Sequence, residues 1–118
     1  MQAGAGKDGV IPEAKGLPCS ELTPAQHAQL LKLVGLWVDD LPAKPAAARM
    51  AELDGQLKKA HFAWNGPFTP GSDASYHLVG PEIIVEYNGQ DLGGNPLDHI
   101  HSIYRNPANE YGAQWTKE

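Results

Sequence analysis

Two histidines separated by a single residue lie in the stretch LDHIHSIYRNPANEYG, residues 97–112. If this stretch is a β-strand, alternate residues share a face, and His99, His101 and Arg105 point the same way. Imidazole nitrogens are common zinc and copper ligands, and two histidines at this spacing can bind one ion. The pair therefore predicts a divalent transition-metal site of the zinc or copper class. The alternative is a strand whose histidines only hydrogen-bond to carboxylates and water.

A transition-metal site needs a third ligand, and His77 and Glu86 are the main candidates for it. Both lie in segments expected to be paired strands, but the sequence does not give the register that would place them on the face of His99. His61 is a further candidate, whereas Asp98, which precedes the pair and points to the opposite face, suits a supporting hydrogen bond or a turn better. If the domain is an enzyme, a metal-bound water or dioxygen species would do the chemistry.

Arg105 and two aromatic residues, Trp64 and Tyr104, are the candidates for binding a small molecule. The forked donors of an arginine suit an anionic group, and aromatic rings can line a pocket. Each also has a plainer role. Arg105 can pair with Glu86 or Glu110, and aromatic residues in strands most often pack in the core.

Composition excludes several classes of function. Nine Lys and Arg against fourteen Asp and Glu give a net charge of −5, and the basic residues are scattered, which argues against nucleic-acid binding. Cys19 is the only cysteine, so an internal disulfide and a multi-cysteine zinc site are excluded. No stretch approaches the roughly 20 apolar residues of a membrane span, and no signal-peptide pattern is present. The compartment stays undecided.

The length of 118 residues fits one domain, which we expect at residues 16–118 after a flexible lead-in at residues 1–15. Thr23, Pro24 and Gln26 form a capping-box pattern at the start of an amphipathic helix that ends before Pro42. A second helix is expected from about residue 45 to 59.

The second half of the chain has the pattern of strands. Segments 61–66, 74–80, 82–89 and 98–105 are rich in β-branched and aromatic residues and are separated by Gly, Pro and Asn. The sequence thus predicts an α+β fold: two N-terminal antiparallel helices packed on one face of a three- to four-stranded antiparallel sheet.

Four blocks of the chain, GLPCSELTPAQHAQLLKLV, FAWNGP, YHLVGPEIIVEY and DHIHSIYRNPANEYG, together resemble the DUF3500 family of uncharacterised bacterial and fungal proteins. The blocks occur in the family's order with similar gaps over about residues 16–115. The resemblance implies a domain in which His99, His101, Arg105, Trp64 and Glu86 are prominent. It implies no chemistry, because the family has no established function.

The resemblance also shows departures. Typical members are several times longer, so the chain is expected to match their C-terminal part. Many members have Arg where this chain has His77, and Asp where it has Glu110. Many continue into a helical segment ending in another histidine, so a third metal ligand from that segment is expected to be absent here.

Three hypotheses follow. The first is a small metal-binding domain that uses His99 and His101, with His77 or Glu86 completing the shell and with or without a metal-dependent reaction. The second is a non-enzymatic module that binds a small organic acid or carbohydrate around Trp64, Tyr104 and Arg105. The third is a structural or assembly domain that forms a homodimer through exposed strand edges and aromatic residues.

Overall fold

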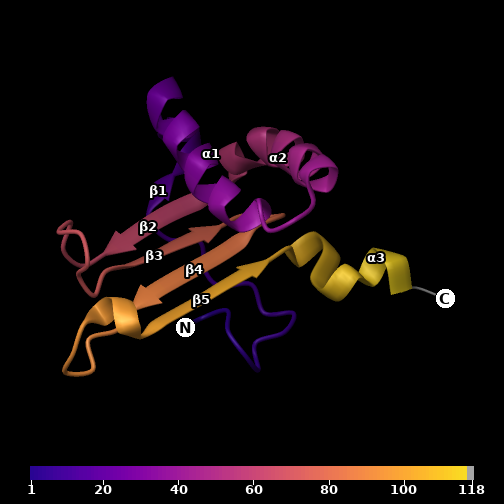
Figure 1. Cartoon of the computed structure of the whole chain (residues 1–118). Coiled ribbons are helices and arrows are strands. Elements are labelled where there is room, and N and C mark those ends of the chain that lie inside the picture. Colours follow the sequence, from indigo (N-terminus) through magenta and orange to yellow (C-terminus); the bar gives the residue numbers. More distant parts are fainter. Residues whose placement is uncertain (117–118) are drawn as a thin grey trace.

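The computed structural model describes residues 1–116, which form an α+β fold built on a five-stranded antiparallel sheet (Figure 1). The order of the strands in the sheet follows the chain: β1 (Leu17–Pro18), β2 (His61–Asn65), β3 (Ser75–Val79), β4 (Ile84–Gly89) and β5 (Ile100–Arg105). The predicted α+β class is confirmed, but the sheet has five strands where three to four were predicted. The additional strand β1 has two residues, one of them a proline, and such a segment shows no alternating pattern.

Within the described residues, three α-helices accompany the sheet. α1 (Pro24–Val38) begins with the predicted capping box, in which Thr23 and Gln26 bond to each other's backbone N–H. α2 (Ala43–Gln56) carries Pro45 in its first turn, where a missing N–H costs little. The prediction that all helices are N-terminal was wrong, because α3 (Ala113–Thr116) follows β5. Its single turn is too short for a periodic pattern. No helix within residues 1–116 has the length and apolar character to cross a membrane.

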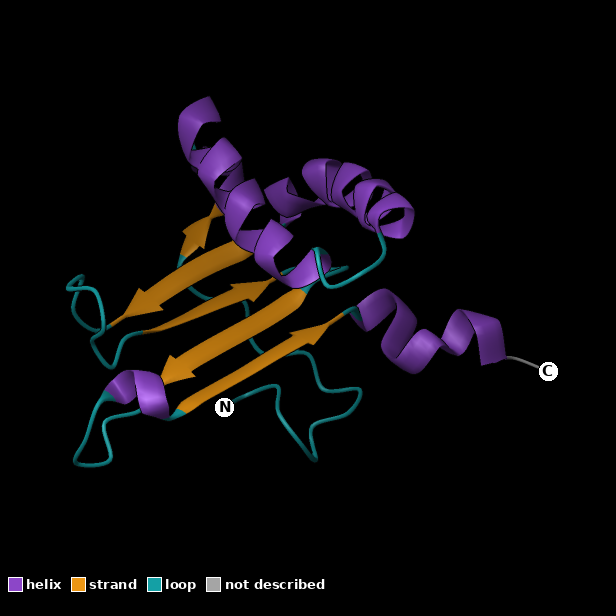
Figure 2. Cartoon of the chain, viewed as in Figure 1, coloured by secondary structure: helices purple, strands orange, loops and turns teal. Residues whose placement is uncertain are grey.

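The helices α1 and α2 lie on one side of the sheet, as Figure 2 shows, and this side holds the main core. Alternate strand residues point toward the helices, and we call this surface the helix-side face. Its residues pack with buried side chains of both helices, and the buried members of this core are Cys19, Leu30, Val34, Val38, Ala46, Leu53, Leu57, Ala60, Tyr76, Leu78, Ile83 and Val85.

The opposite surface of the sheet, here called the far face, is formed by the other alternate residues. The strand register places the following residues on this face: His61, Ala63 and Asn65 of β2; Ser75, His77 and Val79 of β3; Ile84, Glu86 and Asn88 of β4; and His101, Ile103 and Arg105 of β5. The N-terminal segment lies against this surface, on the side away from the helices (Figure 1). Ala3 is only 1% exposed and packs with Val79, Ile84 and Ile103. The division of the chain at residue 15 stays a prediction.

Gly16 marks the point where the chain leaves the far face and enters β1. Its φ of +91° lies in the region that favours glycine. A Cβ at this position would lie 2.2 Å from the carbonyl oxygen of Phe62. Only glycine therefore fits this close passage around the edge of β2.

Candidate functional site

The far face gathers most of the residues that the sequence singled out. His77 pairs directly with Glu86, as expected for two neighbouring strands, and His77 Nε2 lies 3.7 Å from Glu86 Oε1. His101 and Arg105 stand on the same face, two residues to either side of Ile103. His77, Glu86 and His101 thus share with Arg105 a surface that the helices do not cover.

The histidine pair is formed, although β5 begins at Ile100 and His99 precedes it. His99 Nε2 and His101 Nε2 lie 2.7 Å apart, with ring centroids at 4.7 Å, and both residues are exposed. One ring N–H can donate to the other ring's lone pair at this distance. Two lone pairs can also share one ion, because metal–nitrogen bonds of about 2.0–2.1 Å place two ligand nitrogens about 3 Å apart. A small rotation of the rings converts the hydrogen-bonded arrangement into one in which both lone pairs face a single ion.

Glu86 is engaged elsewhere. The residue is 1% exposed, and its two carboxylate oxygens accept hydrogen bonds from the backbone N–H groups of Gln2, at 2.9 Å, and Ala3, at 2.7 Å. The cross-strand partner of His101 is Asn88. Glu86 lies two residues before Asn88 in β4 and pairs with Ile103 on one side and His77 on the other, so neither Glu86 nor His77 lies opposite His101. Within residues 1–116 there is no group of three His, Cys, Asp or Glu side chains that could hold a metal ion. The structure therefore does not bring His77 and Glu86 to the histidine pair.

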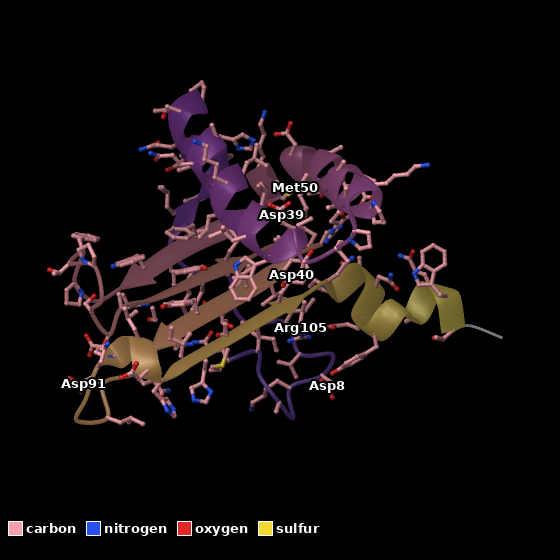
Figure 3. All side chains as sticks on the ribbon, viewed as in Figure 1. Asp8, Asp39, Asp40, Met50, Asp91 and Arg105 are labelled. Carbon is pink, nitrogen blue, oxygen red and sulfur yellow. The ribbon has the colours of Figure 1, made fainter. Side chains whose placement is uncertain are left out.

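Arg105 is also surrounded by protein groups and is 8% exposed. Its Nε donates to Glu110 Oε1 at 2.9 Å, and Nη2 donates to the same oxygen. Its Nη1 donates to the carbonyl oxygens of Val10, at 2.9 Å, and Ala3, at 3.4 Å. The hydrogen bond to Glu110 raises the pKa of Arg105 further above its usual value. Figure 3 shows Arg105 on the side of the sheet where Asp8 lies.

The two aromatic candidates lie on the helix-side face. Trp64 is 42% exposed and stacks on Tyr76 with ring centroids at 6.4 Å. The hydroxyl of Tyr104 accepts a hydrogen bond from Arg49 Nε at 3.2 Å. Since Arg105 points to the far face, the structure does not bring these three side chains into one site. The small-ligand hypothesis built on them stays a prediction.

Residues 1–10 lie against the far face, and the sequence did not predict that they cover it. They carry three glycines and few apolar residues, which is typical of a flexible segment. The usable signal lay in β4, where Glu86 interrupts a run of apolar residues. A carboxylate buried in a strand needs hydrogen-bond donors, and such donors have to come from another part of the chain.

The fold and the far face define a class of protein: an α+β domain whose antiparallel sheet has helices on one side and its own N-terminal segment on the other. The family model described as "Protein of unknown function (DUF3500)" matches residues 1–113. The chain belongs to the DUF3500 family, as its motifs predicted. The match starts at residue 1 and so includes the segment on the far face. Comparison with curated proteins and with solved structures gave no match.

Proposed function

We propose that His99 and His101 bind a divalent transition-metal ion of the zinc or copper class. The supporting observation is the 2.7 Å approach of their Nε2 atoms at an exposed position. Two neutral imidazoles are suitable ligands for such an ion. The remaining coordination positions would be filled by water or by a group from another molecule, because no third side chain of residues 1–116 joins the pair.

A two-histidine site is a weaker site than a complete tetrahedral shell, and its open positions are where any reactivity would arise. A bound ion in this position would supply a Lewis acid that can activate water. The exposed rings leave room for a ligand to approach. Imidazole must be neutral to coordinate, so metal binding should weaken as the pH falls.

The test is a calorimetric titration of the full chain with Zn(II) and Cu(II), combined with NMR of the histidine rings. We expect saturable binding that shifts the resonances of both His99 and His101. Replacing either one with Ala should weaken binding by about tenfold or more, equivalent to about 1.4 kcal/mol. His77→Ala and Glu86→Gln should leave it unchanged, because these residues lie away from the pair.

His27→Ala is the matched control, since His27 Nε2 is paired with Asp54 Oδ1 at 2.8 Å on the helices. A chain that stays metal-free at stoichiometric Zn(II) and Cu(II), with no shift of the two rings, contradicts the proposal. Equal losses in His27→Ala and His101→Ala would contradict it too, because they would point to nonspecific histidine binding.

A second function, self-association through β5, is favoured by the position of this strand. β5 has six residues and is the last strand in the sheet, so it pairs with β4 on one side only within residues 1–116. A strand edge with unpaired N–H and C=O groups can pair with a second chain. Ile100, 42% exposed, would lie in such a contact.

Size-exclusion chromatography with light scattering tests this second function. We expect a dimer at micromolar concentration that dissociates in Ile100→Lys, because a lysine on an edge strand opposes pairing. Leu36→Lys, at an exposed position of α1, should leave the mass unchanged. A monomer at this concentration removes the proposal.

A further inference from the structure

We propose that the far face is a binding site for a glycine-rich peptide segment that folds back in turns, which it recognises through the main chain. In this chain, residues 1–10 occupy the site as an intramolecular ligand. Glu86 and Arg105 bond to the main chain of the segment and are together called the clamp, and Tyr111 also donates a hydrogen bond to the side chain of Asp8.

The clamp contacts the backbone of the segment. The two oxygens of Glu86 accept from two consecutive N–H groups, those of Gln2 and Ala3. Arg105 donates to the carbonyl oxygens of Ala3 and Val10. A carboxylate thus binds main-chain donors and a guanidinium binds main-chain acceptors, and hydrogen bonds to charged groups are about twice as strong as neutral ones.

A small apolar floor beneath the clamp accepts one side chain. Ala3 is 1% exposed and contacts Val79, Ile84 and Ile103. The side chains of Gln2 and Ala5, before and after it, are exposed. The site therefore selects a small residue at one position and tolerates variation at its neighbours.

Burial of the clamp indicates that these contacts are needed. Glu86 is 1% and Arg105 8% exposed, and a buried charge is costly unless it is hydrogen-bonded. Among residues 1–116, the partners of the clamp side chains are His77 beside Glu86, Glu110 beside Arg105, and main-chain groups of residues 1–10. A peptide with the same main-chain groups and a small residue at the floor offers the same partners.

The segment itself is poorly suited to hold one conformation without the clamp. Gly4, Gly6 and Gly9 give it high conformational entropy when free, and Gly6 and Gly9 have positive φ. Its release therefore restores entropy that its binding had cost. A second peptide can then enter, with an apparent affinity reduced by the fraction of time that residues 1–10 occupy the site.

The experiment measures binding of a labelled, acetylated peptide with the sequence of residues 1–11 to the full chain, by fluorescence anisotropy. Ala3→Glu introduces a carboxylate beside Glu86 and should expel the chain's own segment. Ala5→Glu makes the same charge change at an exposed position and serves as the matched control. We expect Ala3→Glu to bind the peptide at least about tenfold more tightly than the wild type or Ala5→Glu.

Two further variants make the result decisive. Adding Glu86→Gln to Ala3→Glu should abolish the gain, because the carboxylate that accepts both N–H groups is lost. Gln2→Pro removes one donor without touching the floor, and it replaces Ala3→Glu if far-UV circular dichroism shows that Ala3→Glu does not fold. The proposal is overturned if folded variants bind the peptide no better than the wild type, or if Glu86→Gln leaves the gain intact.

Discussion

The two faces of the sheet are covered in different ways, although they are built from the same strands. The helix-side face is covered by α1 and α2 through apolar side chains such as Leu53 and Leu78. The far face is covered by residues 1–10 through hydrogen bonds to Glu86 and Arg105 and one small apolar contact at Ala3. One sheet is thus covered by apolar packing on one side and, on the other, mainly by hydrogen bonds to the main chain of the covering segment.

The largest expected effect is on the helix-side face. Leu53 is fully buried in α2, and Leu53→Ala should lower the free energy of unfolding by about 2–5 kcal/mol through lost burial and a cavity. Leu36→Ala, at a position that is 72% exposed, should change it by less than about 0.5 kcal/mol. Urea unfolding followed by circular dichroism measures both. Similar values for the two variants would mean that the helices do not supply the main core.

A smaller effect is expected on the far face. Glu86→Ala removes the acceptor of two backbone N–H groups and should cost about 1–3 kcal/mol of unfolding free energy. Hydrogen exchange at Gln2 and Ala3 should accelerate, while exchange in α1 stays slow. Glu13→Ala, at an exposed site, is the control. If exchange at Gln2 and Ala3 does not change, the segment is held by something other than Glu86.

The smallest effect concerns pH and belongs to the helix-side face. Burial raises the pKa of the Cys19 thiol above its ordinary value of 9.0 and also raises the pKa of Tyr76. The unfolded chain then loses these protons at lower pH than the folded chain. Stability should be constant below the ordinary thiol pKa and fall as the pH rises through it.

Urea unfolding between about pH 7 and pH 11 checks this dependence. Cys19→Ala should reduce the loss of stability that begins near the ordinary thiol pKa, and it should leave the loss that comes from Tyr76 at higher pH. An equally steep fall in Cys19→Ala would show that Cys19 does not contribute to it.

Much of the fold could be predicted because its signals are local. The capping box at Thr23 and Gln26, the apolar spacing of α1 and the β-branched run of β4 depend on neighbours in the sequence. β1 and α3 carried no comparable signal, because two and four residues are too few to show a period.

The sequence indicated which residues are candidates for the site, but it did not indicate which of them lie together. The sequence indicated that His99 and His101 are close, and a spacing of two residues is enough for that. It did not place Glu86, since the partners of Glu86 are more than eighty residues away in the chain. Strand register and long-range contacts depend on how the whole domain packs, and a single sequence does not give them.

The two edges of the sheet limit how copies of this domain can assemble through strand pairing. At one edge, β1 is two residues long and contains Pro18, which has no N–H to offer. At the other edge, β5 extends over six residues. If two copies joined through β5, a twofold axis would relate them and both long edges would be consumed. The pair would then expose only the opposite edges, where the two residues of β1 cover His61 and Phe62 of β2 and leave a short template for further pairing.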